Sequence, residues 1–347
     1  MSMSCTCGAV DIHTHFVPEN FPAYVGSHAD APWPSTAAAN SCHRHVMVRG
    51  SIYRTVSEQS WSVGRRISDM HMQRTAHQVL SPMPELLGYW LDVDDGAALC
   101  RFLNETVAEM VGQAPGQFSG LAAVPLQDVD CAIRELEFAS TVLGLKGAEL
   151  GTNVNGKPLG HPDFLPFFQA AAKLGASIFV HPLRPAGAER LIGPPMLEQV
   201  LGFPGETGLC AASIITGNVL EKAPGLRIAF SHGGGSLASL LPRLQHGWNT
   251  FQPLREFCVE PRASARRMFY DMLVYDDATI NRLIDVFGLN QLMVGSDYPF
   301  SIMDADANQR VHRLSISDDQ KHGLIAGNAL SWLGVSNAAQ LKERVGG

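Results

Sequence analysis

Charged side chains are scarce in this sequence of 347 residues, because Asp, Glu, Lys and Arg make up only 17% of it while apolar residues make up 46%. Soluble domains usually carry about 25% charged residues. We therefore expect extensive burial and a sizeable subunit interface. The formal net charge is -7 and no block of basic residues offsets it. This argues against a surface that binds nucleic acid or an anionic membrane.

The sequence also lacks the features of a membrane span, a signal peptide and a C-x-x-C motif. No apolar run approaches the roughly 20 residues that a membrane-spanning helix needs. The first residues lack the basic and apolar regions of a signal peptide. Seven scattered cysteines contain no C-x-x-C motif and are expected to be reduced thiols, with Cys5 and Cys7 an incidental pair. These features predict a cytoplasmic protein.

Strand-like runs alternate with helical patterns over most of the chain. After a first strand around Val10, such runs lie at 78–82, 121–124, 147–150, 177–180, 227–230, 268–272 and 291–294. Helical patterns lie at 95–112, 129–143, 163–174, 207–222, 236–251, 277–287 and 318–333. Eight alternating strands predict an α/β fold, a (β/α)8 TIM-type barrel that forms a single domain over residues 1–347. A doubly wound sheet is the alternative.

One long segment, residues 17–66, interrupts this alternation after the first strand. It is rich in Pro, Ser, Ala and Gly and shows no helical period. Loops of this length usually build a lid or a binding wall. We therefore interpret it as a small insertion or lid, with a hairpin formed by 46–48 and 51–53. Its three histidines are expected to be structural or on the surface: His28, His43 and His45.

Two histidines, His13 and His15, are separated by a single residue directly after an apolar run that contains Ala9, Val10 and Ile12. Alternate side chains of a strand point to the same face. Both imidazoles can therefore reach one metal ion, although an H-x-H pair also arises by chance.

Three later strand-like runs also end in side chains suited to metal binding or proton transfer. His181 follows the fifth run, His232 follows the sixth and precedes three glycines, and Asp297 follows the eighth. Each alone has a structural explanation, as a hydrogen-bonded histidine or a turn-forming aspartate. In a barrel, however, the C-terminal ends of the strands meet at one rim, where active sites lie. The sequence therefore predicts one shared site that also includes His13 and His15.

Imidazole nitrogens combined with one carboxylate suit zinc or another first-row divalent ion, such as manganese. Such an ion lowers the pKa of its bound water toward neutrality. A second ion would need a bridging group from the middle of the barrel, but Lys146 precedes the fourth run instead of following it. We therefore expect one ion. Glu149, within that run, is a further candidate ligand, with a polar interior role as the alternative.

The motifs D-I-H-T-H, V-H-P, F-S-H-G-G-G and G-S-D-Y-P-F occur in this order along the chain. Together they resemble the amidohydrolase superfamily. More narrowly, they resemble its decarboxylase branch, typified by 2-amino-3-carboxymuconate-6-semialdehyde decarboxylase. Similar segments at 123–128, 203–207 and 232–243 extend the resemblance over most of the chain.

The resemblance divides the roles within the predicted site. It assigns four side chains to the metal ion: His13, His15, His181 and Asp297. It leaves His232 as a general acid and base beside the metal-bound water, a task that suits an imidazole near neutral pH. Asp297 is expected to orient the water or to move a proton as well.

The same resemblance implies that arginines hold the carboxylates of the substrate. Arg54 in the insertion and Arg243 after the glycine-rich turn match its pattern, and planar guanidinium groups suit bidentate carboxylate binding. Arg243 would reach the site of the neighbouring subunit, so a homodimer is expected. A surface or ion-paired role is the alternative for each arginine. Phe300 is expected to form a wall of the pocket, although packing alone also accounts for it.

The function that these features predict is metal-dependent, non-oxidative decarboxylation of a small carboxylated aromatic or muconate-semialdehyde-like acid. The main alternative is hydrolysis or hydration of a related small acid, amide or lactone by the same ion and water. A third hypothesis is a non-catalytic barrel with a structural ion. Structural zinc sites are generally closed and rich in cysteine, which disfavours this third hypothesis.

Overall fold

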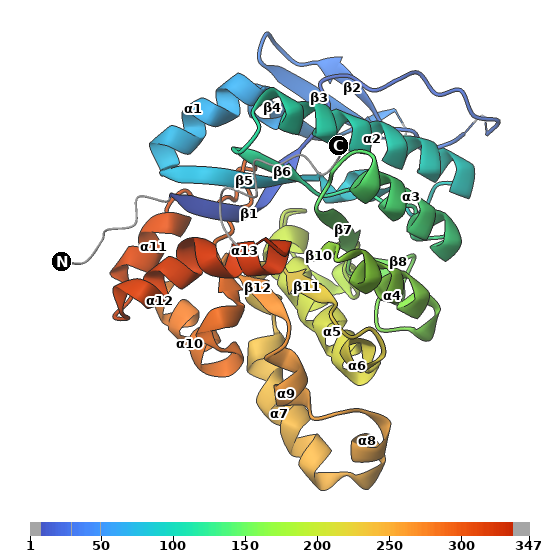
Figure 1. The fold of residues 1–347 in the computed structure, drawn as a ribbon. Coiled ribbons are helices and arrows are strands. Elements are labelled where there is room, and N and C mark those ends of the chain that lie inside the picture. Colours follow the sequence, from blue (N-terminus) through green and yellow to red (C-terminus); the bar gives the residue numbers. More distant parts are fainter. Residues whose placement is uncertain (1–7, 29, 49, 336–347) are drawn as a thin grey trace.

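The computed structural model describes residues 8–28, 30–48 and 50–335 (Figure 1). Cys5 and Cys7 lie outside these residues. No helix in the described part of the chain combines the length and apolar character needed to cross a membrane.

Parallel strands form the centre of the fold (Figure 1). One sheet has the order β1 (Ala9–Phe16), β5 (Thr75–Pro82), β6 (Phe118–Gly120). The other has the order β13 (Leu292–Met293), β12 (Phe269–Asp271), β11 (Arg227–Phe230), β10 (Ser177–His181), β7 (Gly147–Gly151). Every neighbouring pair in these two sheets is parallel. The predicted α/β class is therefore confirmed.

Backbone hydrogen bonds also link the edges of the two sheets. Ala122 N–H donates to Gly147 O at 2.8 Å, and Ala122 O accepts from Glu149 N–H at 2.9 Å, which joins the segment after β6 to β7. At the other edge, Ile12 N–H of β1 donates to Val294 O, directly after β13, at 3.0 Å. Backbone hydrogen bonds therefore connect the two sheets at both edges.

Helices follow the strands, mostly at the predicted positions. They are α1 (Val63–Gln73), α2 (Val93–Gln113), α3 (Val129–Thr141), α4 (Leu165–Leu174), α5 (Phe203–Thr216), α6 (Val219–Lys222), α7 (Leu237–Thr250), α8 (Gln252–Phe257), α9 (Pro261–Ala265), α10 (Asp277–Phe287), α11 (Ala307–Arg313), α12 (Asp318–His322) and α13 (Asn328–Leu333).

Local structure explains where one helix begins and where two predicted helices are divided. The Asp128 carboxylate accepts a hydrogen bond from Cys131 N–H at 2.8 Å and starts α3, as a helix cap should. The helix predicted over 207–222 is instead divided into α5 and α6, because Asn218 adopts a left-handed conformation with φ 55°. The helix predicted over 318–333 is likewise divided by a π-helical turn at Gly323–Gly327.

The segment after β1 contains a small antiparallel sheet of β2 (Ser35–Ala38), β3 (His43–Val48) and β4 (Ser51–Ser57). The predicted hairpin is therefore confirmed as the pair β3 and β4. Val46 and Val56 are buried beneath this sheet. Helix α1 begins at Val63, inside the range that the sequence marked as irregular.

One buried histidine that is not part of the predicted site makes the stability of the fold depend on pH. His77 of β5 is 2% exposed, and its Nδ1 and Nε2 atoms contact Gly116 O at 3.1 Å and Ser119 Oγ at 2.9 Å. Burial lowers the pKa of His77 from 6.5 to about 4. Its contribution to stability is therefore complete above pH 6.5 and is lost as the pH falls toward 4, because only the unfolded state gains the proton.

When the pH falls from 7.5 to 5, the unfolding free energy of the wild type should fall. That of His77→Gln should fall by about 2 kcal/mol less. Urea unfolding at both pH values measures this difference, and His28→Gln, at a largely exposed side chain, is the matched control. Equal losses in the wild type and in His77→Gln would contradict the assignment.

Candidate metal centre and active site

The H-x-H pair lies on β1, a strand in which every residue is buried. His13 and His15 point to the same face, and their Nε2 atoms are 3.1 Å apart. Both residues are fully inaccessible to solvent. The predicted convergence of these two imidazoles is therefore confirmed.

The ends of two other strands bring Asp297 and His181 to the same point. Asp297 Oδ1 is 3.4 Å from His13 Nε2 and 3.2 Å from His15 Nε2. The His181 ring centroid is 5.2 Å from that of His13 and 5.0 Å from that of His15. One ligand atom from each of these four residues lies within 4.8 Å of the other three. The structure thus brings together the four predicted ligands.

The outer nitrogen of each imidazole is held by an acceptor, which leaves Nε2 directed toward the centre. His15 Nδ1 donates to Pro82 O at 3.1 Å, and His181 Nδ1 donates to Pro182 O at 3.0 Å. Because a carbonyl oxygen only accepts, both Nδ1 atoms carry the proton and both Nε2 atoms keep a free lone pair. His181 Nε2 and Asp297 Oδ1 are buried without a hydrogen-bond partner in the described structure. This donor set fits a divalent cation.

Sequence reasoning missed Asp271, the last residue of β12. Its Oδ2 atom accepts a hydrogen bond from His13 Nδ1 at 2.7 Å, while Oδ1 accepts from Gly233 N–H at 2.9 Å and Leu273 N–H at 3.0 Å. A carboxylate on the outer nitrogen orients a ligating histidine and raises its basicity. The signal was present, because Asp271 lies at a strand end like the residues that were identified.

Asp11 ties the two ligand-bearing segments to each other. Its Oδ1 atom accepts from His13 N–H at 3.2 Å and from Ser296 N–H at 3.1 Å, and its Oδ2 atom accepts from Ser296 Oγ at 2.5 Å. In addition, Asp297 N–H donates to His13 O at 2.8 Å. The acidic residue of the D-I-H-T-H motif therefore positions the ligands and does not bind with them.

The carboxylates around His13 favour positive charge on this imidazole. Burial alone would lower the pKa of His13, but its hydrogen bond to the Asp271 carboxylate and the nearby Asp297 carboxylate raise it to about 10. Metal binding at this nitrogen set consequently competes with protonation.

Glu149 is buried but does not join the four ligands. Its Oε2 atom is 3.6 Å from His15 Nδ1, the nitrogen that faces away from the centre. Burial raises the pKa of the Glu149 carboxyl group to about 8. The hypothesis that Glu149 is a ligand is therefore not supported, and the polar interior role describes it.

His232 lies beside the four ligands but outside their group. Its ring centroid is 5.5 Å from that of His13 and 5.3 Å from that of His181. Burial and the charge of His13 lower the pKa of His232 to about 4, so the imidazole is neutral near pH 7 and can accept a proton. The backbone here is strained, with φ 56° at His232, as is common at functional sites.

The turn after His232 depends on glycine at one position in particular. Gly235 has φ 57°, and a Cβ atom there would lie 2.0 Å from Pro204 O. No other residue fits this close approach. The turn thereby holds His232 at the C-terminal end of β11.

A cavity of about 310 Å³ opens onto the centre. Three of the predicted residues of the centre line it: His181, His232 and Asp297. Arg54 and Phe300 also line it, and the Arg54 guanidinium carbon lies 4.3 Å from the Phe300 ring centroid. Phe300 in turn stacks on the His15 ring, with 5.1 Å between the ring centroids. It therefore packs against one of the candidate metal ligands and also borders the cavity. The volume is within the range of small-molecule sites.

Arg243 is not brought to this cavity within its own chain. It lies on α7, where its side chain is exposed. Helices α7 and α8 project away from the sheets (Figure 1). Its predicted role at a neighbouring subunit stays a prediction.

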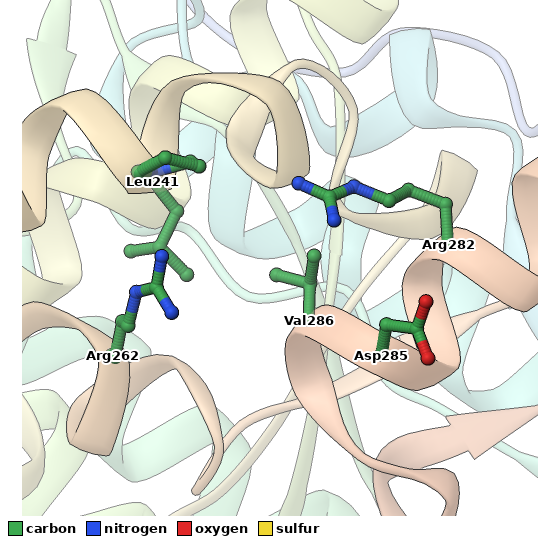
Figure 2. A pocket seen from close by; sticks show the side chains of 6 residues that line it. Leu241, Arg262, Arg282, Asp285 and Val286 are labelled. Atoms are coloured by element: carbon green, nitrogen blue, oxygen red, sulfur yellow. The ribbon is translucent and has the colours of Figure 1, made fainter.

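A second hollow, of about 60 Å³, lies between α7, α9 and α10. Arg262 and Arg282 direct their guanidinium groups toward it, while the carboxylate of Asp285 points away (Figure 2). None of the predicted site residues lines it. It is far below the size of a typical ligand site, and the centre described above is the candidate active site.

Comparison with known proteins agrees with this geometry. The sequence profile of a family described as amidohydrolase matches residues 10–335. The chain belongs to the amidohydrolase family. It is 33% identical, over 94% of its own length and 91% of the other chain, to 2-amino-3-carboxymuconate-6-semialdehyde decarboxylase of Dictyostelium discoideum.

Two further similarities bear on this amidohydrolase. It is 31% identical to 6-methylsalicylic acid decarboxylase of Penicillium expansum, over 68% of its length and 73% of the relative. Its fold matches dihydroxybenzoic acid decarboxylase from Polaromonas, a structure with bound manganese, with a TM-score of 0.76 and 20% identity over 97% of this chain and 100% of that one.

We expect Asp271→Asn to weaken metal binding by about 10- to 100-fold. The neutral amide would no longer stabilise positive charge on His13. It would also place an N–H donor against Gly233 N–H or Leu273 N–H. Metal content after dialysis against graded chelator concentrations measures the effect. Asp285→Asn, at an exposed carboxylate of α10, is the matched control, and unchanged metal retention in Asp271→Asn would contradict the role.

Proposed function

We propose that this protein is a metal-dependent, non-oxidative decarboxylase of a small carboxylated aromatic or muconate-semialdehyde-like acid. The observation that carries the proposal is the convergence of three imidazoles and one carboxylate beside His232, at a cavity that also contains Arg54. The relatives that the chain matches over most of its length are decarboxylases, which supports the same chemistry here in the degradation of aromatic acids.

We propose a single zinc ion as the cofactor, with manganese as the alternative. The four-residue donor set supports either ion, and the similar Polaromonas structure contains manganese. When bound, such an ion supplies Lewis-acid polarisation of oxygen atoms and lowers the pKa of water. Residues His13, His15, His181 and Asp297 would hold it.

The other residues bind the substrate and move its proton. Arg54 binds a substrate carboxylate, and the flat ring of Phe300 borders the space where a planar acid lies. As CO2 leaves, the C–C bond breaks and its electron pair stays on the substrate carbon. His232, neutral in the resting site, relays a proton from solvent to that carbon. One solvent proton is therefore consumed for each CO2 that is released. Asp297 would also orient the water.

The decisive experiment separates CO2 release from gain of water. Metal-loaded protein is incubated with carboxylated aromatic and muconate-semialdehyde acids, and the products are identified by mass. We expect CO2 and the decarboxylated acid. Products that have gained water, or cleavage of amides and lactones without CO2 release, would favour hydrolysis or hydration instead.

His232→Asn should lower kcat for CO2 release by about 100- to 10,000-fold, the usual contribution of a general acid and base. Metal content should stay at the wild-type level, because His232 lies outside the group of ligands. Metal analysis of the same sample is the control. A variant that keeps wild-type kcat would exclude His232 from proton transfer.

We also propose that the eight parallel strands close into one (β/α)8 barrel within a single domain, with residues 17–66 as its lid. The hydrogen bonds between the two sheets support closure, and Arg54, which lies in this segment, supports the lid because it lines the cavity. A single calorimetric unfolding transition is expected. Two separable transitions would contradict a single domain.

We propose further that the protein is a cytoplasmic homodimer in which Arg243 serves the site of its partner. Five described cysteines are free, which suits a reducing compartment, and cell fractionation tests the location. Exposed Arg243 on the projecting helix α7 supports the intersubunit role.

A mixture of two inactive variants tests this arrangement. Arg243→Ala and His232→Asn should each lose activity as separate samples. Mixed dimers have one site with an intact His232 and an intact Arg243, so re-equilibrated mixtures should recover about one quarter of wild-type activity. If Arg243 acts within its own chain, or if the protein is monomeric in sedimentation analysis, no activity will return.

A further inference from the structure

The cavity contains an acidic side chain in addition to the predicted arginine. Glu85 lies in the short 3-10 helix Pro84–Leu87, directly after β5, and lines the same cavity as Arg54 and His232. Its position at the end of β5 places it at the mouth of the strands, like the metal ligands. None of the roles described above uses it.

The Glu85 carboxylate is only half satisfied. Tyr53 O–H, on β4, donates a hydrogen bond to its Oε1 atom. Its Oε2 atom is buried and has no hydrogen-bond partner among the described residues. A buried oxygen left unpaired is costly, and the last torsion of a glutamate side chain is soft. A rotation about this torsion would bring the oxygen to the cavity that Glu85 lines.

Arg54 does not neutralise Glu85. In the described part of the chain, no salt bridge within 4.0 Å joins the two side chains, and Arg54 instead lies over the Phe300 ring. The cavity therefore offers a guanidinium donor and a separate carboxylate acceptor. A ligand satisfies both when it carries an anionic group for Arg54 and a hydrogen-bond donor for Glu85.

We propose that Glu85 is a specificity-determining residue, which selects acids that carry a hydroxyl or amino group in addition to their carboxylate. This rests on the proposed decarboxylase function. The donor group forms a hydrogen bond with Glu85 Oε2. An acid with a second carboxylate at this place would be repelled by Glu85, and an acid with only a C–H group there would leave Oε2 without a hydrogen bond. Tyr53 is a positioning residue, because it holds the other carboxylate oxygen.

The test compares matched acids in the wild type, Glu85→Leu and Glu198→Gln. Each pair of acids differs only by a hydroxyl or an amino group on the same ring position, so the two kinds of donor are assessed separately. Glu198 is an exposed carboxylate on the neighbouring π-helical turn and serves as the control. The readout is the ratio of kcat/KM for the acid with the donor to that for the acid without it.

We expect the wild type and Glu198→Gln to favour the acid with the donor by about 10- to 100-fold at one ring position, the scale of a hydrogen bond to a charged group. Glu85→Leu should reduce this ratio to near one, while kcat/KM for the plain acid is unchanged or higher. An equal loss for both acids would show that Glu85 has only a structural role and would overturn the proposal.

Calorimetric titration of the same acids into metal-loaded protein gives an answer that does not depend on turnover. If no acid releases CO2, the decarboxylase function fails, and the ratio of the two Kd values still reports on Glu85. A wild-type ratio near one for every pair, with both the hydroxyl and the amino group, would overturn the selection by Glu85 whether or not CO2 is released.

Discussion

Repulsion between lone pairs is the constraint on which the candidate site depends. The Nε2 atoms of His13 and His15 are 3.1 Å apart, and Asp297 Oδ1 lies within 3.4 Å of both. These atoms are fully buried, so water does not separate them. Positive charge at this point offsets the repulsion, and a divalent cation held by the four residues would supply it. The hydrogen bonds on the outer nitrogens serve this arrangement, because they fix where the protons are.

Close backbone packing makes the arrangement possible. A Cβ atom at Gly295 would lie 2.7 Å from Asp271 Cβ and 2.9 Å from His13 Cβ, so glycine allows the histidine and its supporting carboxylate to meet. Asp297 and Tyr275, which both line the cavity, have φ angles of 65° and 58°. Left-handed backbone at such residues costs free energy that the surrounding fold must offset. Strain, metal ligands and cavity therefore coincide at the ends of the strands.

The segment after β1 contributes one charged side chain to the cavity and a hydrogen bond to a second. Strand β4 places Arg54 in the cavity and Tyr53 against Glu85, so one hairpin contributes a cationic donor and also orients an acidic acceptor. The four candidate ligands lie on or directly after the strands, whereas this hairpin and the turn after β5 contribute Arg54 and Glu85 to the lining of the cavity. Binding residues on loops around a rigid scaffold commonly divide the work in this way.

The sequence alone predicted the α/β alternation and the four candidate metal ligands that the structure brings together. Both follow from local patterns, which are the period of apolar residues and the side chain that ends each strand. It did not place Asp271, Glu85 or Gly295 in the site, although each follows or ends a strand, since their roles exist only as contacts with residues that are distant along the chain. His13 and Asp271 are separated by 258 positions and meet at 2.7 Å. Glu149 shows the opposite case, because its strand position suited a ligand but tertiary packing set it against the outer nitrogen of His15. Only the tertiary structure decides such pairings, because a hydrogen bond depends on the distance between two atoms in space and not on their separation in sequence.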